Sequence, residues 1–585
     1  KKTFIIFSTA FLFLLMTSPL GSAASKINMN VHLNQPIYEP SDEMIVRIKI
    51  KPKVDVSDVR VALKIGEEDH YVFARTHFLG NIKKDKEQEV EFTKNNAKSF
   101  GLELGKNPFL VEVTEKQKTI SRFSTDLGLR ETIHENKMRL SLAVSLADKP
   151  HLDIDKNVKN RTVQKRILPM LEKYGVLSNK YRGLINYIFS PILAETLSKI
   201  SGEYTLIEKN GPTTIPPSSH SSLRAKRIKN SFNKLFSSKT SGLIFTTYTQ
   251  ARSKELSPKD LDDQFEEGRK ILGSVFSQPS VATYPPQGQF YEGQPKDKNG
   301  LWLSKNTSKP VANIKTTLPL LKGKNRKAST IRALAHLVEK YNDGNSDLVI
   351  VTADMARPDN IAHFLSVAKK QKWLRLAPLR SLKTSSKKSA SEPDPYVRKI
   401  PKLKEARRTY VLLSEALASE NIAFDQAKMA IYLAEDKNTD EKTARELASK
   451  ASTLLKKEIE SIILKLSPLT LTGSQGKLPI KIINNSNSRY KLFLEIKTDR
   501  LDIKNKKKTI EIGPRENLVS IPVKVLQGGK HRVLVQLRTK SGIISKQYLV
   551  VSTSLPTSFW YYFASVFAVL LLIILGAFYA RAKRN

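Results

Sequence analysis

Hydrophobic and polar residues alternate with a period of two in the stretch that follows the first 24 residues. Such alternation is typical of strands that bury one face. Pro36, Pro40 and Gly66 separate the runs and mark turns. Several short strands divided by turns predict an immunoglobulin-like β-sandwich over residues 25–133. The clearest runs are Asn28–Leu33, Met44–Ile50 and Val59–Ile65.

The same alternation returns near the end of the chain. Asn484-Asn485, Gly528-Gly529 and Ser541-Gly542 mark turns between the runs. We therefore expect a second immunoglobulin-like β-sandwich over residues 467–553. Its predicted strands are Leu478–Ile483, Tyr490–Ile496, Leu518–Val525, Arg532–Leu537 and Ile543–Val551.

A different pattern fills residues 137–382, where short apolar runs alternate with stretches of helical period. Leu140–Leu146 and Leu348–Thr352 are predicted strands, and Arg161–Tyr174 is a predicted helix. Alternation of strands and helices predicts a parallel sheet covered by helices. About seven strands over this length favour a β/α barrel over an open sheet.

Residues 383–400 hold few apolar side chains and predict a linker. Residues 401–466 then predict a helical segment of two helices. Leu403, Tyr410 and Leu413 line the first helix, and Asn438 with Glu441 indicates the start of the second. The expected fold class is therefore multidomain, α/β plus all-β.

The two ends of the chain predict a membrane protein. Residues 559–580 carry no charge and are long enough to cross a bilayer, and the basic residues of 581–585 favour a cytoplasmic tail. Residues 1–24 have the basic start, apolar run and small residues of a signal peptide. We expect a single-pass cell-membrane protein with a large N-terminal ectodomain. The alternatives are a buried core helix at 559–580 and an uncleaved N-terminal anchor.

The amino-acid composition limits the chemistry and the binding partners that we expect of the chain. The chain has no cysteine, which excludes thiolate catalysis and favours a bacterium that does not build its exported proteins on disulfides. The formal net charge of +42 would suit a nucleic-acid binder, but a signal peptide and anchor exclude that class. Envelope polymers or phospholipid headgroups are then the expected anions. A lysine-rich proteome without a specific partner is the alternative.

Candidate chemistry lies where predicted strands end, because barrel enzymes place their catalytic groups there. Asp148 and Asp354 are the candidate catalytic carboxylates, and a retaining glycosidase needs such a pair about 5 Å apart. The alternative is that both are turn or vestigial residues. The candidate ligand-binding residues are His151, Tyr248, Tyr284 and Trp302. We predict no metal site and no cofactor, since the paired-Asp and paired-His motifs of a metal-dependent deacetylase are absent from the sequence.

Three stretches carry a resemblance to a known family. They are Ser145-Leu-Ala-Asp-Lys-Pro-His151, the region from Ile331–Leu337 through Leu348–Thr352 to Trp373-Leu374, and Leu469–Asn485. The chain resembles an uncharacterised actinobacterial family of secreted, C-terminally membrane-anchored proteins, often encoded beside the lipid II flippase. A tryptophan that the family often carries before Leu-Ala-Asp is absent here.

This resemblance implies a degenerate glycosidase- or deacetylase-like barrel between immunoglobulin-like domains, and a role in cell-envelope biogenesis. We therefore expect a membrane-anchored binding or scaffold protein of peptidoglycan assembly. Its expected partners are cell-wall glycan or another anionic envelope polymer, and envelope proteins such as the lipid II flippase. The alternatives are an active hydrolase or deacetylase of wall polysaccharide and, third, an adhesin.

Overall fold

The computed structural model describes residues 26–67, 70–131, 137–251, 256–278, 281–285, 302–304, 313–316, 320–383, 400–554 and 558–583. The predicted signal peptide and residues 384–399 of the predicted linker lie outside this part. The chain forms two compact units. The first holds Lys1–Asp148, Asn160–Tyr248 and Phe265–Asp394; the second holds Lys149–Lys159, Thr249–Gln264 and Pro395–Asn585. Two short segments of the region 137–382 therefore belong to the second unit.

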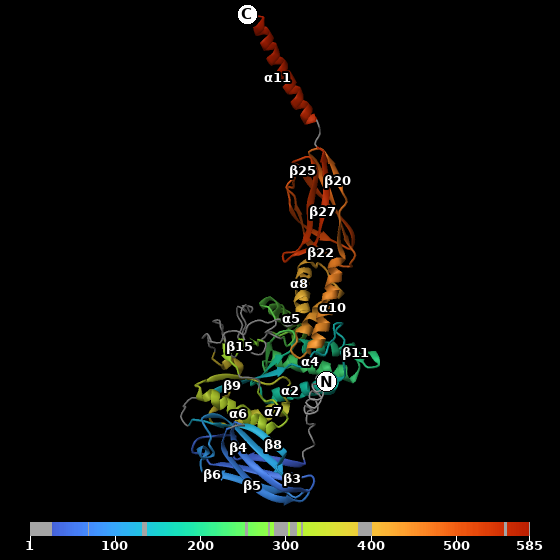
Figure 1. Ribbon diagram of the computed structural model, residues 1–585. Helices are drawn as coiled ribbons and strands as arrows, with labels where there is room; N and C mark the ends of the chain where they lie inside the picture. The colour runs from blue at the N-terminus through green and yellow to red at the C-terminus, as the bar shows by residue number, and fades with distance from the viewer. Residues whose placement is uncertain are drawn as a thin grey trace, which may run out of the picture. The chain divides into compact units, whose positions relative to one another are not determined.

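The first unit begins with two packed β-sheets, the N-terminal sheet pair (Figure 1). One sheet has the order β1-β3-β6 and the other β2-β8-β7-β4-β5. Alternate residues of both sheets form one apolar core, as the period-two pattern predicts. The strands are β1 (Ile27–Leu33), β2 (Ile37–Tyr38), β3 (Met44–Pro52), β4 (Val56–Glu67), β5 (His70–Ile82), β6 (Gln88–Lys94), β7 (Gly105–Glu115) and β8 (Lys118–Leu129).

A parallel sheet follows in the same unit. Its order is β16-β15-β14-β13-β10-β9-β17, and β18 also pairs with β9. Two isolated parallel bridges, Thr316↔Val349 and Leu320↔Thr352, join the segment after β16 to β17 and the residue after it. The strands are β9 (Met138–Leu146), β10 (Ile185–Phe189), β13 (Gly242–Phe245), β14 (Ala282–Thr283), β15 (Trp302–Ser304), β16 (Asn313–Lys315), β17 (Asp347–Val351) and β18 (Leu374–Leu376).

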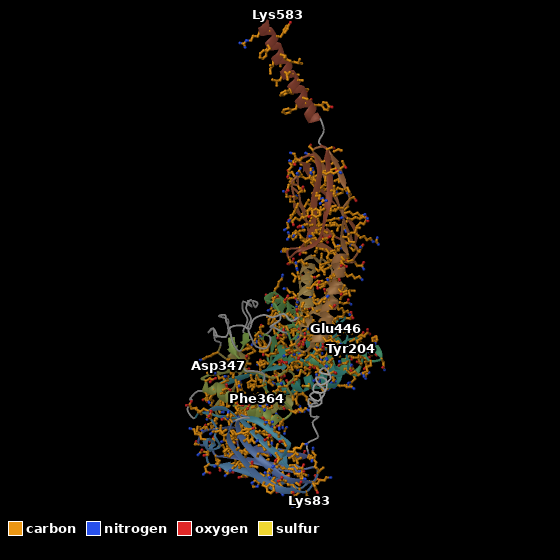
Figure 2. All side chains as sticks on the ribbon, in the orientation of Figure 1. Lys83, Tyr204, Asp347, Phe364, Glu446 and Lys583 are labelled. Atoms are coloured by element: carbon orange, nitrogen blue, oxygen red, sulfur yellow. The ribbon has the colours of Figure 1, made fainter. Side chains whose placement is uncertain are left out.

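Helices separate these strands along the chain, as predicted. The predicted helix Arg161–Tyr174 is a π-helical turn, Val163–Ile167, that continues into α2 (Leu168–Lys180). Phe364, which Figure 2 labels, is fully buried. The other elements here are α3 (Pro191–Ile200), the hairpin β11 (Tyr204–Glu208) and β12 (Gly211–Ile215), α4 (His220–Ser237), α5 (Pro258–Phe276), α6 (Arg326–Asn342) and α7 (Pro358–Ala368).

Helix α6 packs against both the N-terminal sheet pair and α7 within this unit. It packs on β7 and β8 (Figure 1). The Thr125 hydroxyl donates a hydrogen bond to the Ala328 carbonyl oxygen (3.0 Å), and Arg332 pairs with Asp126 (3.4 Å). Gly128 makes close packing possible, because a Cβ there would lie 3.2 Å from Ala335 Cα.

In the second unit, residues 401–460 form three helices where two were predicted: α8 (Pro401–Ala416), α9 (Ile422–Glu435) and α10 (Glu441–Glu460). The start of α10 also differs from the prediction, since its N-cap is Asp440, which accepts the Thr443 N–H, and not Asn438. The predicted helical segment 401–466 ends early. Residues Ile462–Lys465 form β19 instead, because they pair with β21.

Two further sheets, the C-terminal sheet pair, complete this region, with the orders β19-β21-β25-β23 and β20-β27-β26-β22-β24. Near one end, Leu417 pairs with Tyr490, and the Glu458 carboxylate accepts the Tyr490 hydroxyl (2.6 Å). The helical segment therefore covers that end. The remaining strands are β20 (Leu469–Thr472), β21 (Gln475–Asn484), β22 (Tyr490–Lys497), β23 (Leu501–Asp502), β24 (Lys507–Ile512), β25 (Arg515–Val525), β26 (Gly529–Arg538) and β27 (Ile543–Ser554).

The last helix, α11 (Ser558–Ala582), is followed by Lys583 (Figure 2). Residues Tyr561–Arg581 are long and apolar enough to cross a membrane, and none of this stretch is buried in the protein. No other helix in the described part of the chain passes that test.

Candidate functional site

The predicted carboxylates Asp148 and Asp354 follow neighbouring strands of the parallel sheet. Strands β9 and β17 pair in parallel, so their carboxyl ends lie at the same edge. The Ser145 hydroxyl, near the end of β9, donates to the Asp354 carboxylate (2.6 Å). The N–H of Met355 donates to the Ser145 carbonyl oxygen (2.9 Å). Asp354 is thus held against the neighbouring strand.

The backbone at this point is strained. Met355 has φ 48°, in the left-handed region that residues with a Cβ rarely adopt. Such conformations cost about 1–3 kcal/mol and concentrate at functional sites. The bond from Met355 to Ser145 is one contact that supports this conformation.

Asp148 has a different partner. Its carboxylate forms an ion pair with the Arg166 guanidinium, which lies in the π-helical turn. About half of the Arg166 side chain is exposed, and exposed pairs contribute about 0–1 kcal/mol to stability. Each predicted carboxylate therefore lies at a strand end, and each has a partner of its own.

A third polar group of this unit surrounds Tyr248, which follows β13 and is 1% exposed. Its hydroxyl donates to the Glu195 carboxylate of α3. Burial raises the pKa of Tyr248 well above its ordinary value, and the negative charges of Glu195 and Glu267 raise it further. The phenol is therefore a neutral hydrogen-bond donor to Glu195.

Gly268 lets α5 approach the backbone of the segment that follows β13. A Cβ at residue 268 would lie 2.6 Å from the Thr246 carbonyl oxygen and 3.1 Å from the Tyr248 nitrogen. A neutral donor bonded to a carboxylate has the chemical parts of general acid–base catalysis. Sequence reasoning missed Glu195 and Glu267. One signal was available, because Glu195 is a lone charge in the apolar start of α3.

The other predicted ligand residues of this unit lie elsewhere. Tyr284 is buried in the apolar core formed by the parallel strands, and its N–H donates to the Phe245 carbonyl oxygen (2.7 Å). The backbone of Trp302, in β15, pairs with Thr283 of β14, and the side chain of Trp302 lies outside the described part of the structure.

His151 belongs to the second unit and is 2% exposed. It sits in a compact turn, where its carbonyl oxygen accepts the Lys159 N–H (2.9 Å) and the Asp153 carboxylate accepts the N–H groups of Asp155 and Asn157. The described residues contain no group of three or more His, Asp or Glu side chains able to hold a metal ion.

A buried ionic cluster is the main electrostatic feature of the second unit. Arg407 of α8, with 3% of its side chain exposed, donates two hydrogen bonds to Glu435 (2.7 and 2.5 Å). It also donates to Asp263 (2.5 Å) and lies 3.7 Å from Asp260. Burial alone would lower the pKa of Arg407, but the surrounding carboxylates raise it well above its ordinary value. The guanidinium is therefore charged.

Beside this cluster lies Asp436, which is fully buried. It accepts the N–H groups of Gln250 (3.0 Å) and Asn438 (2.7 Å), and burial raises its pKa to about 6. Lys159 is near enough to interact with Asp436. The turn 149–159 and the segment 249–264 are thus both tied to the helical segment. Gln426 of α9 adds a bond to Asp155 (2.6 Å).

Comparison with known proteins gives no family. No family model and no curated protein matches the chain. Among solved structures, the C-terminal domain of wzt is 9% identical, over 19% of this chain and 76% of that one, with a TM-score of 0.16. The sporulation control protein Spo0M of Bacillus subtilis is 12% identical, over 18% and 49%, with a TM-score of 0.14. A Niemann-Pick type C2 protein of the Japanese carpenter ant is 17% identical, over 19% and 98%, with a TM-score of 0.15.

Proposed function

We propose that this protein is a single-pass envelope protein whose residues 25–555 lie outside the cytoplasm and serve as a binding or scaffold module in bacterial cell-wall assembly. Helix α11 supports the anchor by its length and composition. The basic residues Arg581, Lys583 and Arg584 support a cytoplasmic C-terminus. The proposed relatives are the actinobacterial envelope proteins that the sequence resembles.

We further propose that the parallel sheet is a degenerate β/α barrel and that each sheet pair is an immunoglobulin-like domain. The strand order of the parallel sheet follows the chain from β9 to β16, and bridges link the segment after β16 back to β17. This arrangement supports a barrel. Two mostly antiparallel sheets around one core support the immunoglobulin-like interpretation of the N-terminal sheet pair.

One observation supports the scaffold proposal. The segments that follow β9 and β13 make structural contacts with the helical segment. In barrel enzymes such loops form the substrate site. Here the segment 249–264 supplies Asp260 and Asp263 to the buried cluster around Arg407, and the turn 149–159 is bonded to α9. A loop fixed by a buried ionic cluster has little freedom to close over a substrate.

The proposed partners are anionic polymers of the envelope, including wall glycan, and envelope-assembly proteins such as the lipid II flippase. The formal net charge of +42 supports an anionic partner, since a strongly basic surface attracts polyanions.

A glycan hydrolase or deacetylase remains the second candidate, and the group Glu195–Tyr248–Glu267 favours it. In it Glu195 accepts the hydroxyl of a buried phenol close to the end of β13, and the negative charge of Glu267 also acts on that phenol. Retaining and inverting glycosidases both need two carboxylates.

Complementation of a deletion strain separates the two candidates. The variants are the Asp148→Asn/Asp354→Asn double variant and Glu195→Gln, which keep side-chain size but cannot act as a carboxylate base or nucleophile. A scaffold should retain full function in both at normal protein level. Loss of a catalytic acid or base would instead lower the rate by a factor of about 10² or more.

Asp359→Asn, at an exposed position in the first turn of α7, is the matched control. Loss of function in either test variant, with normal protein level and an active control, would overturn the scaffold proposal in favour of a hydrolase.

A further inference from the structure

The C-terminal sheet pair is connected to α11 by a very short segment. Strand β27 ends at Ser554 and α11 begins at Ser558. Four residue steps span at most about 14 Å, because an extended chain covers about 3.6 Å per residue. If α11 is the membrane anchor, on which this inference rests, the part of the sheet pair that contains Ser554 lies close to the membrane surface.

The end of β20, the start of β26 and the turn before β26 lie at this part of the sheet pair, which we call the Ser554 end. Thr472 of β20 pairs with Ser554, and Lys530 of β26 pairs with Ser552. The turn between β25 and β26 contains Leu526, whose N–H donates to the Arg500 carbonyl oxygen (3.1 Å). Lys524 pairs with Asp502 and Gln475 in the neighbouring strands. The opposite end of the sheet pair is the one that the helical segment covers.

The Ser554 end is basic. Residues 499–506 and 524–530 contain five basic residues, Arg500, Lys504, Lys506, Lys524 and Lys530, against the two acidic residues Asp499 and Asp502. All five basic side chains are exposed, and none forms an ion pair with another described residue. Leu526 is 54% exposed among them. Cations around an exposed apolar side chain match the headgroup and acyl boundary of an anionic bilayer.

We propose that the Ser554 end binds the headgroups of anionic phospholipids and so docks the C-terminal sheet pair onto the membrane that holds α11. Each basic residue near an anionic surface contributes about a fivefold gain in binding. The attraction falls off within a Debye length of roughly 8–10 Å. The short connection keeps the Ser554 end near enough to the membrane for its cations to come within that distance. Because the connection tethers the surface to its ligand, docking needs only a weak intrinsic affinity.

A single fluorescent label tests this proposal directly, because the chain has no cysteine of its own. Full-length protein with Leu526→Cys is labelled and placed in nanodiscs of phosphatidylcholine alone or with about one quarter phosphatidylglycerol. We expect the label to be several-fold less accessible to a water-soluble quencher in the anionic discs. High salt, about 0.5 M, should remove the difference by screening.

Charge reversal identifies the residues responsible. The variant Arg500→Glu/Lys524→Glu/Lys530→Glu should abolish the protection, whereas Lys491→Glu/Arg515→Glu/Lys540→Glu, at exposed positions away from the Ser554 end, should keep it. The milder Arg500→Gln/Lys524→Gln/Lys530→Gln variant repeats the test if charge reversal perturbs folding, which circular dichroism checks.

A second label, at Leu571→Cys within α11, separates this inference from the membrane anchor itself. If the Leu571 label is shielded in both discs while the Leu526 label is equally quenched in both, docking is overturned and the anchor stands. If the Leu571 label is open to the aqueous quencher, the anchor fails, and docking fails with it.

Discussion

The buried side chain of Arg407 has more acidic residues around it than any other side chain described above. It pairs with Glu435 and Asp263 and lies close to Asp260. Removing one partner of such a cluster leaves buried charge uncompensated, which typically costs about 3–5 kcal/mol.

We expect Arg407→Met to lower the free energy of unfolding of the second unit by that amount, measured by urea denaturation. Arg408→Met, one position along the same helix and exposed, should change it by less than about 0.5 kcal/mol. Equal effects of the two substitutions would show that the cluster adds no stability.

Asp436 predicts a pH dependence. Folding raises its pKa from 3.8 to about 6, so the folded protein binds a proton more readily than the unfolded chain. The free energy of unfolding should therefore fall as the pH rises from about 4 to about 6, by roughly 3 kcal/mol. Calorimetry of Asp436→Asn should show this slope removed, and Asp425→Asn, exposed on α9, should retain it. An unchanged slope in Asp436→Asn would assign the proton to another group.

Single residues of the site were predictable only where the local pattern marked them. Asp148 and Asp354 follow apolar runs, and the structure places both at strand ends. Arg407 lies between Leu403 and Tyr410 on the predicted apolar face of its helix, where a charge demands a buried partner. That partner, Glu435, is on another helix, and a one-dimensional pattern cannot pair them.

At the scale of elements, the close packing of α5 depends on one glycine, Gly268. A methyl group at Gly268 would press on the backbone of Thr246 and Tyr248. We expect Gly268→Ala to destabilise the first unit by about 1–3 kcal/mol in thermal unfolding. Gly273→Ala in the same helix meets nothing within 4 Å and should stabilise it by up to about 1 kcal/mol. A stabilising Gly268→Ala would contradict the close approach.

Elements with strong periodicity were predicted and weakly patterned ones were missed. Strands β16 and β18 have three residues each, too few to show a period. Helix α9 is apolar nearly all round from Met429 to Ala434, so it has no stripe. Residues Ile462–Lys465 continue the apolar spacing of α10, yet pairing with β21 makes them a strand. Tertiary contacts decided each of these cases.

At the scale of the whole molecule, the proposed membrane topology can be tested with a protease. With residues 25–555 outside and 581–585 inside, protease added to intact protoplasts should remove the ectodomain and leave only the membrane-protected end. In the proposed orientation α11 crosses the bilayer and the basic tail stays in the cytoplasm. Full protection of the chain from the protease would contradict the proposed orientation. A cytoplasmic marker protein, intact throughout, is the control.

The second unit is assembled from three separated stretches of chain. Asp260 and Asp263 leave the ribosome about 140 residues before Arg407, the cation that neutralises them. At roughly 5–20 residues per second, they wait on the order of ten seconds for their partner. This unit therefore cannot close while the early part of the chain is being made. If the chain is exported as proposed, this delay is an advantage, because the second unit stays unfolded until Arg407 of α8 has been synthesised.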